Sequence, residues 1–246
     1  MKILVTNDDG IHSEGLHVLA EALMSAGEVI VVAPDRERSS VAHSLTMHRP
    51  LRVEKVRENT YAVDGTPVDC VILGVYMLRP ERPGIIASGI NKGENMGEDI
   101  LYSGTVSAAL EGTIMGIPSF AISSVARRDF KFGGAGEFAL RVARFIQRNG
   151  LPQETLLNIN VPNVEAGQIQ TYRITRQGRR IYGDVVDEKT DPRGRTYYWI
   201  GGNALSYERE EGTDFEAVSR GYVSITPLHP NLTFSQRLPE METWEI

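Results

Sequence analysis

Two adjacent carboxylates, Asp8 and Asp9, stand directly after a short apolar run and directly before Gly10. Consecutive strand residues point to opposite faces, so both carboxylates can reach one point only if the chain turns here, which Gly10 permits. Neighbouring carboxylates repel each other, and a hard cation such as Mg²⁺ or Mn²⁺ commonly keeps both ionised. The motif therefore indicates a metal site, although an isolated Asp-Asp-Gly is more often a solvated turn in which Asp9 caps the following helix.

A second polar turn, residues 34–40, follows the apolar run 29–33 and lies beside the first turn if the two strands pair. The hydroxyl of Ser39 could then ligate a cation or orient a ligand, or it could only cap the turn. His43 comes shortly afterwards and could reach a substrate. The histidines do not form a His-Glu-x-x-His zinc pair, so the others are expected to be structural.

The third polar turn, which ends a later predicted strand, is the richest of the three. Asn91 and Asn95 lie among three glycines spaced by four residues, so the backbone can approach a ligand and the amides can donate or accept. Ser103, Gly104 and Thr105 then begin a predicted helix, whose free amides and dipole favour an anion. The segment predicts a phosphate cradle, with a long surface loop as the alternative.

Strand and helix patterns predict how these turns are positioned. Residues 3–5 and 29–33 are predicted strands and residues 13–27 a predicted helix between them, which makes a βαβ unit. The pattern recurs, with strands at 84–88 and 119–123 and helices at 68–78, 105–115 and 136–148. The sequence thus predicts an α/β fold with a doubly wound, mostly parallel, Rossmann-like sheet. Ligands bind at the carboxyl ends of the strands in such sheets, where the three turns should meet.

The pattern changes in the last third of the chain. Predicted strands at 168–175, 179–185 and 196–201 are separated by charged and glycine-containing turns, and the tail from Leu228 has little periodicity. We therefore expect an α/β catalytic core over residues 1–160. Residues 161–246 are expected to form a smaller C-terminal β-hairpin region and an arm packed on the core.

Composition limits the classes of partner. The 246 residues are 41% hydrophobic and 24% charged, as in ordinary soluble proteins, and the formal net charge is −6. No diffuse positive field is present to attract polymeric nucleic acid, although a local pocket can still bind a small phosphorylated ligand. The single Cys70, the early acidic residues and the lack of a membrane-length apolar span predict a cytoplasmic protein without a membrane partner.

The sequence resembles the stationary-phase survival protein family, SurE, whose members are metal-dependent 5′/3′-nucleotidases. The resemblance extends nearly from end to end and keeps the order of the motifs. The motifs that carry it are residues 7–10, 33–35 with 38–39, 65–67 with 69–70, 88–105 and 175–180. Glu94 departs from the pattern, because proline is expected before the second asparagine of the third turn.

The resemblance implies roles for individual residues. One divalent cation per subunit, Mn²⁺ or Mg²⁺, would be held by a set of four residues: Asp8, Asp9, Ser39 and Asn91. The phosphate would face another set: Asn95, Ser103, Gly104 and Thr105. Asp8, Asp9 and Asn95 would be catalytic.

The resemblance also implies substrates and assembly. Ribo- and deoxyribonucleoside monophosphates are the expected substrates, with short-chain polyphosphate as a further one. The expected assembly is a homodimer or homotetramer in which the hairpin and arm are exchanged between protomers.

Two other classes of function remain open from the residues alone. A metal-dependent deacetylase or esterase could use the same acidic turn, but such sites usually add histidine ligands for zinc, and no histidine lies beside the third turn. A regulatory module could bind a nucleotide without hydrolysing it. Turnover with added metal would separate this module from an enzyme.

Overall fold

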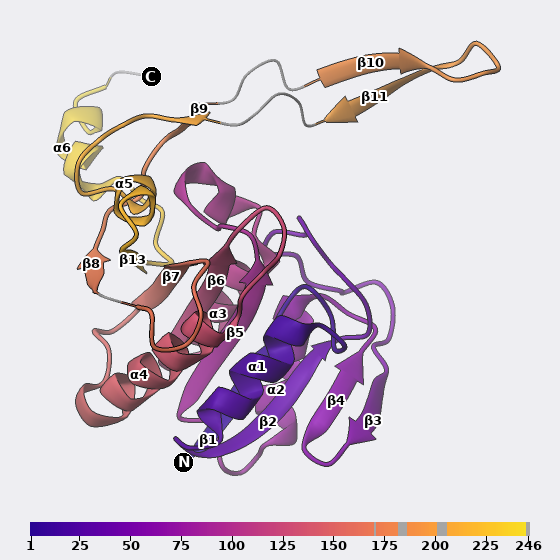
Figure 1. Ribbon diagram of the computed structural model, residues 1–246, viewed down its shortest axis with the longest axis vertical. Coiled ribbons are helices and arrows are strands. Elements are labelled where there is room, and N and C mark those ends of the chain that lie inside the picture. Colours follow the sequence, from indigo (N-terminus) through magenta and orange to yellow (C-terminus); the bar gives the residue numbers. More distant parts are fainter. Residues whose placement is uncertain (170, 182–185, 201–205, 245–246) are drawn as a thin grey trace.

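The computed structural model describes residues 1–169, 171–181, 186–200 and 206–244. Its centre is a sheet with the strand order β3-β4-β2-β1-β5-β6-β7-β13-β8 (Figure 1). The strands of this sheet are β1 (Lys2–Thr6), β2 (Glu28–Pro34), β3 (Val53–Arg57), β4 (Thr60–Val63), β5 (Ile85–Lys92), β6 (Ser119–Val125), β7 (Leu156–Pro162), β8 (Tyr172–Ile174) and β13 (Val223–Leu228). The pairs from β4 to β7 are parallel, whereas β3 and β13 run antiparallel to their inner neighbours. The predicted α/β fold with a mostly parallel sheet is confirmed.

Four helices cover the two faces of the sheet. Helices α1 (Glu14–Leu23) and α4 (Gly133–Asn149) pack together on one face, and α2 (Pro67–Met77) and α3 (Gly104–Ile114) pack together on the other. The start of α2 is fixed by a capping box, in which the Thr66 hydroxyl accepts from the Asp69 amide and the Asp69 carboxylate accepts from the Thr66 amide. All four helices agree with the sequence prediction to within a few residues.

The core consists of two apolar layers separated by the sheet. Strand β1 supplies both of them, because Ile3 and Val5 face α1 and α4 whereas Leu4 faces α2. All three side chains are fully buried. This explains why β1 and β2 are continuous apolar runs in the sequence rather than alternating ones.

The strand order reverses direction at β1, since β2 lies on one side of it and β5 on the other. Such a reversal creates a crevice at the carboxyl ends of the two flanking strands, which is where ligands bind in open α/β sheets. The first polar turn follows β1, and the third follows β5.

The C-terminal part adds strands to the sheet and a separate hairpin. Strands β13 and β8 extend the main sheet, and β9 (Arg180–Ile181) pairs with β12 (Ser206–Tyr207). Strands β10 (Val186–Thr190) and β11 (Thr196–Ile200) form an antiparallel hairpin that stands away from the body of the molecule (Figure 1). The remaining elements are α5 (Asp214–Ser219), η2 (Ser235–Arg237) and α6 (Leu238–Met241).

Several strands differ from the prediction. Strands β3, β4, β7, β10, β12 and β13 were not predicted. The predicted strands 168–175, 179–185 and 196–201 correspond to β8, β9 and β11, while residues 170, 182–185 and 201 of these ranges lie outside the described residues. Within the described ranges, no helix is both long enough and apolar enough to cross a membrane.

Candidate active site

The three polar turns meet at the carboxyl edge of the sheet, as predicted. The amide of Arg38 in the second turn donates to the Asp8 carbonyl at 2.7 Å. The amide of Lys92 in the third turn donates to Asp9 Oδ2 at 3.2 Å. The hydroxyl of Thr105, at the start of α3, donates to Asp8 Oδ1. Asp8 and Asp9 are therefore the residues at which all three turns are joined, through the Asp8 carbonyl and the two carboxylates.

The shape of the first turn is set by a buried asparagine. Asn7 Nδ2 donates to the Gly10 carbonyl at 3.1 Å and to Ser13 Oγ at 2.7 Å. Gly10 has a φ of +94°, which residues with a side chain rarely adopt. Ser13, rather than Asp9, caps α1 by accepting from the Leu16 amide, so the helix-cap explanation of Asp9 is wrong. Both carboxylates remain available for a ligand.

Burial makes the two carboxylates hard to ionise together. The Asp8 side chain is 5% exposed, and burial raises its pKa to about 6, with Asp9 adding to the increase and the Thr105 hydroxyl opposing it. Burial also raises the pKa of Asp9, while the Lys92 amide lowers it. A cation beside both groups would reverse this penalty, which is the fit expected of a metal site.

Two residues with neutral oxygens adjoin the contacts of the aspartates, since Ser39 follows Arg38 and Asn91 precedes Lys92. The hydroxyl of Ser39 donates to Glu37 Oε1 at 2.7 Å, and its lone pairs can still bind a cation. Strand β5 leaves its regular pairing with β6 between Ser88 and Asn91, and such irregularities commonly re-aim a side chain beside an active site. Asn91 Nδ2 then donates to the Gly93 carbonyl at 3.0 Å, which leaves Oδ1 for a ligand.

These donors suit one kind of cation. Two carboxylates, a hydroxyl and a carboxamide form an all-oxygen set of the type that Mg²⁺ and Mn²⁺ accept. In the part of the chain that the structure describes, no group of three or more His, Cys, Asp or Glu side chains is placed to hold a metal. A cation at this edge would therefore depend on the two aspartates together with neutral oxygens.

The start of α3 faces Asp8. The hydroxyl of Ser103 caps the helix by accepting from the Val106 amide at 3.1 Å, a bond that does not involve the amides of Gly104 and Thr105. A Cβ atom on Gly104 would lie 2.8 Å from Asp8 Cβ, so only glycine allows the helix to approach the carboxylate this closely. The positive end of the helix dipole is thus directed toward the acidic site.

Two further predicted residues occupy different surroundings. Asn95 is 7% exposed and donates from Nδ2 to Ser123 Oγ at 3.0 Å, so it lies at the sheet edge. His43 Nε2 lies 2.9 Å from Glu111 Oε2. With a rise of about 1.5 Å per residue, Glu111 is about 10 Å along the helix axis from Gly104, the first residue of α3. His43 is therefore beside the body of α3 rather than its beginning.

A buried arginine holds the third turn from the C-terminal side. Arg180, whose side chain is 5% exposed, pairs with Glu94 at 3.3 Å and with Asp99, and lies over the Phe215 ring at 4.8 Å. Its amide donates to Glu98 Oε2 at 2.7 Å. Glu94, which replaces the expected proline, thus gains an ionic anchor. Arg180 could not be assigned a role from the sequence, because its pairing with Glu94 spans more than 80 residues.

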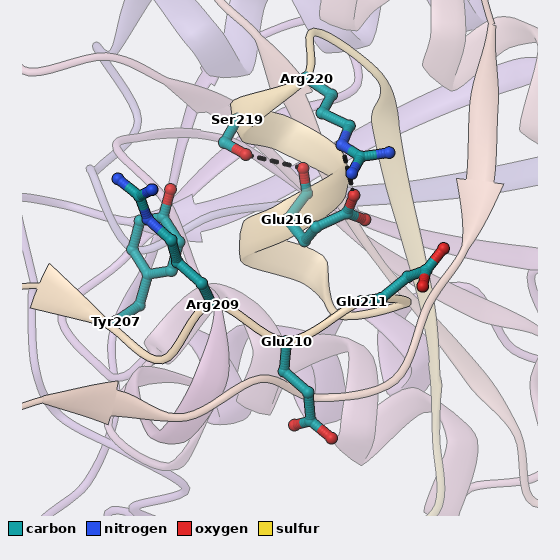
Figure 2. Close-up of a pocket in the computed structure, with 7 residues that line it drawn as sticks. All are labelled: Tyr207, Arg209, Glu210, Glu211, Glu216, Ser219 and Arg220. Carbon is teal, nitrogen blue, oxygen red and sulfur yellow. Dashed lines mark hydrogen bonds and ion pairs between the residues drawn. The ribbon is translucent and has the colours of Figure 1, made fainter.

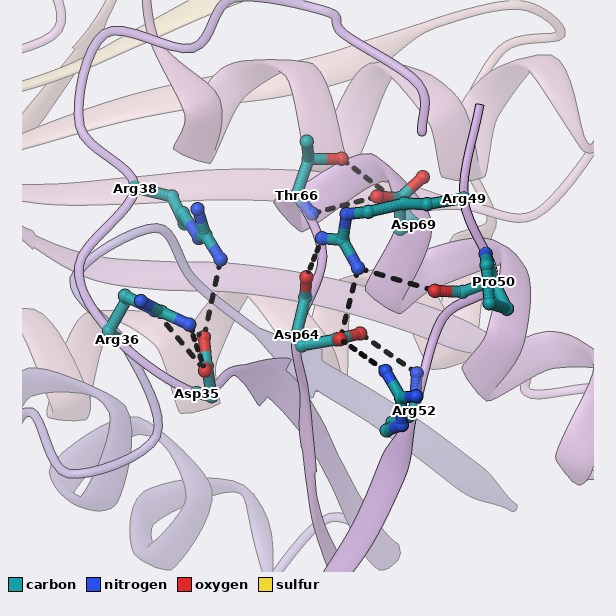
Figure 3. Close-up of polar contacts among 9 residues, drawn as sticks. All are labelled: Asp35, Arg36, Arg38, Arg49, Pro50, Arg52, Asp64, Thr66 and Asp69. Atoms are coloured by element: carbon teal, nitrogen blue, oxygen red, sulfur yellow. Dashed lines mark hydrogen bonds and ion pairs between the residues drawn. The ribbon is translucent and has the colours of Figure 1, made fainter. Parts of the chain in front are cut away.

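The loop that contains the second polar turn is anchored at both ends by aspartates (Figure 3). At its start, Asp35 pairs with Arg38 at 3.4 Å. Near its end, Asp64 accepts from the Arg52 amide at 2.8 Å and from Arg49 Nη1 at 2.9 Å. The hydrogen bond from the Arg52 amide lowers the pKa of Asp64 most, and the charged Arg49 side chain lowers it further.

A separate hollow of 470 Å³ lies beside α5 (Figure 2). Two of its charged residues pair with each other, since Arg220 Nε lies 2.6 Å from Glu216 Oε1, and the Ser219 hydroxyl donates to the Glu216 carbonyl at 2.8 Å. The lining residues are Tyr207, Arg209, Glu210, Glu211, Glu216, Ser219 and Arg220. None of them belongs to the three polar turns, so this hollow is distinct from the site at the sheet edge.

The fold and the site define an α/β protein with an acidic, oxygen-rich centre at a strand-end crevice facing a helix N-terminus. The sequence model of a protein family, described as Survival protein SurE, matches residues 3–184 of the chain. The chain belongs to this family.

Individual relatives support the assignment over the whole length. A protein named 5′-nucleotidase SurE from Pelobacter propionicus is 54% identical to this chain, and the match covers 99% of each sequence. A protein of the same name from Geobacter metallireducens is 53% identical, and the match covers 100% of this chain and 98% of the relative. The crystal structure of the SurE protein from Aquifex aeolicus is similar with a TM-score of 0.88 and 43% identity, over 98% of each chain.

Proposed function

We propose that this protein is a phosphomonoesterase that hydrolyses nucleoside 5′-monophosphates to nucleoside and phosphate. The observation that carries the proposal is the contact between a buried carboxylate and a helix N-terminus, in which Asp8 accepts from the Thr105 hydroxyl and lies against Gly104. An acidic cation-binding group and an anion-binding group thus lie side by side, which suits a phosphate bound to a cation. The relatives named 5′-nucleotidase support the same activity.

The reaction breaks the bond between phosphorus and the ester oxygen; the oxygen of a water molecule replaces the nucleoside, whose ester oxygen gains a proton and leaves as a hydroxyl group. Asp8 is the residue we assign to orient this water and accept its proton. Asn95, Ser103, Gly104 and Thr105 would hold the phosphate oxygens, because phosphoryl transfer depends mostly on positioning and on electrostatic stabilisation. Attack by Asp8 itself, to give an aspartyl-phosphate, is the alternative, and trapping of phosphorylated Asp8 would establish it.

A single divalent cation, Mn²⁺ or Mg²⁺, would be held by Asp8, Asp9, Ser39 and Asn91. When bound, it would neutralise charge on the phosphate and lower the pKa of a coordinated water molecule. The support for this cation is the chemistry of the donors, which are all oxygen, and the buried position of two adjacent carboxylates.

The test is phosphate release by the wild-type protein from 5′- and 3′-nucleoside monophosphates, p-nitrophenyl phosphate and short polyphosphate, with Mn²⁺, Mg²⁺ or EDTA. We expect release from the nucleotides with metal and none with EDTA, and we propose 3′-nucleotides and polyphosphate as further substrates. p-Nitrophenyl acetate is added to the panel as a substrate that an esterase would cleave. Ester cleavage without phosphate release would favour that class, and nucleotide binding without turnover would favour a regulatory module.

We further propose that residues 161–246 form an assembly region packed on a catalytic core of residues 1–160. Tyr198, Trp199 and Ile200 on the projecting hairpin are 60%, 61% and 87% exposed, and a two-stranded hairpin is marginally stable alone. A second copy of the chain that covers this surface would give a homodimer, and pairing of dimers would give a homotetramer.

The location we propose is the cytoplasm. Cys70 is buried, and a thiol stays reduced in that compartment.

A further inference from the structure

Asn95 is held at three of its polar groups by side chains from neighbouring strands. Its amide donates to Asn160 Oδ1 at 2.9 Å, and its carbonyl accepts from Asn160 Nδ2 at 3.0 Å and from Asn158 Nδ2 at 2.8 Å. Its side-chain Nδ2 donates to Ser123 Oγ at 3.0 Å. Side chains of β7 therefore hold both the N–H and the C=O group of Asn95, and a side chain of β6 holds its carboxamide.

The register of the sheet explains how these partners come together. Ser123 of β6 lies directly opposite Asn160 of β7, and Asn158, two residues earlier, shares the same face. The intervening Ile159 and the following Val161 belong to the apolar layer beneath α1 and α4, so the two asparagines point to the other face of the sheet. Both asparagines are 0% exposed and lie inside the sheet, where the backbone is rigid.

The polar row continues into the next strand. Asn160 lies opposite Ser224 of β13, and Asn158 lies opposite Thr226. The Thr175 hydroxyl is within 2.8 Å of both Ser224 Oγ and Thr226 Oγ1. A buried row of polar side chains thus runs across the sheet from Thr175 to Asn95. The residues that alternate with this row along β7 and β13 belong to the apolar layer on the other face.

We propose that Asn160, assisted by Asn158, is a positioning residue that aims Asn95 at the phosphate. The inference rests on the proposed function, in which Asn95 binds the phosphate. Of the Asn95 amide group, Oδ1 and one N–H remain available once Ser123 is bound. Because a displacement of about 1 Å in such a group can cost about 10²-fold in rate, a rigid anchor has a direct effect on turnover.

Asn160 uses both ends of its carboxamide on Asn95. It accepts from the N–H and donates to the C=O of one residue, so it holds the Asn95 peptide groups in a fixed orientation. Aspartate at this position can accept but cannot donate, and leucine can do neither. The series Asn, Asp, Leu therefore removes the two bonds in a graded way while the size of the side chain changes little.

The experiment is a mutant cycle on kcat/KM for a nucleoside 5′-monophosphate with Mn²⁺, using Asn160→Leu, Asn95→Ala and the double variant. Asn160→Leu is expected to lower kcat/KM about 10²-fold. Because Asn160 acts only through Asn95, the double variant is expected to be no more than about threefold worse than Asn95→Ala. Asn160→Asp should be intermediate, and it serves if the leucine variant does not fold.

Asn163 provides the matched control. It also clamps a loop by both ends of its amide, accepting from the Lys131 amide at 2.6 Å and donating to the Asp129 carbonyl at 3.0 Å. Asn163→Leu should leave kcat/KM within about threefold of the wild type. Multiplicative losses in the Asn95/Asn160 cycle, or an equal loss in Asn163→Leu, would overturn the positioning role in an active enzyme.

Two readouts separate this inference from the proposed function. The Mn²⁺ affinity measured by calorimetry should be unchanged in Asn160→Leu, because none of the proposed metal ligands is altered. Amide hydrogen exchange over residues 94–98 should become faster in Asn160→Leu and stay unchanged in Asn163→Leu. An inactive wild type would reject the proposed function alone, whereas unchanged exchange over residues 94–98 would reject the anchoring by Asn160 whether or not the enzyme turns over.

Discussion

The carboxylate of Asp8 is 5% exposed, accepts from the Thr105 hydroxyl and lies beside a second carboxylate. In the absence of a cation this arrangement costs stability, because a buried charge loses its hydration and repels its neighbour. A protein retains such a residue where its charge is needed for a ligand. Asp8 is thus the place where stability and function conflict most directly.

This conflict predicts a stabilised variant. In metal-free protein, Asp8→Asn should raise the free energy of unfolding by on the order of 1–3 kcal/mol, because a neutral amide of the same size replaces a buried charge. The measurement is urea unfolding at pH 7.5 in EDTA. Adding Mn²⁺ should stabilise the wild type but not the variant. A variant that is less stable than the wild type in EDTA would contradict the explanation by charge burial.

At the scale of elements, the third polar turn depends on β9. The ion pairs of Arg180 with Glu94 and Asp99 link residues that are far apart in the sequence. Arg180→Ala should lower the free energy of unfolding by about 2 kcal/mol, because Glu94 and Asp99 each lose an ion pair with this buried guanidinium. Differential scanning calorimetry measures this loss.

A neighbouring arginine is the matched control for Arg180→Ala. Arg179 lies 3.7 Å from Glu208, and both side chains are well exposed. Its replacement by alanine should change stability by no more than about 0.5 kcal/mol. Equal losses in the two variants would show that the site loop does not depend on Arg180.

The loop between β2 and β3 predicts a pH effect. The pKa of Asp64 is lowered in the folded state, so the folded protein binds fewer protons than the unfolded one. The stabilisation is present above the unfolded pKa of about 4 and is lost as the pH falls through the lower folded value. Unfolding of Asp64→Asn measured from pH 7 to pH 3 should therefore show a shallower acid decline than the wild type.

The control for this pH effect is Glu54→Gln, which changes an exposed carboxylate on β3 at the same edge of the sheet. It should keep the wild-type acid decline. If Asp64→Asn also kept that decline, the contacts of Asp64 with Arg49 and Arg52 would not contribute to stability, and the loop would need another anchor.

Elements with a strong apolar pattern could be predicted from the sequence, and others could not. Strand β1 was predicted because Ile3, Leu4 and Val5 are all buried. Strand β3 was missed because all its side chains are exposed, so no hydrophobic pattern marks it. In β7, Asn158 and Asn160 interrupt the apolar run, because they serve the neighbouring turn rather than the core.

The site followed the same rule. The polar turns were predicted because each carries its functional residues within a few positions, and the structure brings Asp8, Asp9 and Thr105 together. The contributions of Asn160 and Arg180 could not be predicted. They depend on contacts across 65 and 86 residues, which only the sheet topology and the C-terminal strands create.

At the scale of the whole molecule, the hairpin of β10 and β11 is the feature for which we propose a partner subunit. Tyr197, Tyr198 and Trp199 are 41%, 60% and 61% exposed on a segment that projects from the body (Figure 1). If a second copy covers them, replacing all three by serine should convert the assembly to monomers in sedimentation velocity. Lys189→Ala, on the paired strand, should leave the assembly unchanged.

The result that contradicts this assembly is equally clear. A triple variant with the same mass as the wild type would show that the hairpin does not hold the protomers together. A wild type that sediments as a monomer at all concentrations would reject exchange of the hairpin altogether.

We propose that the sheet edge around Asp8 is the active site of a metal-dependent nucleotidase. The most direct measurement is phosphate release from a nucleoside 5′-monophosphate with saturating Mn²⁺ by the wild type and by Asp8→Asn, with circular dichroism to confirm that both are folded. We predict metal-dependent release by the wild type and a kcat about 10³-fold lower in the variant. Equal rates in the two proteins, or release that continues unchanged in EDTA, would contradict the claim.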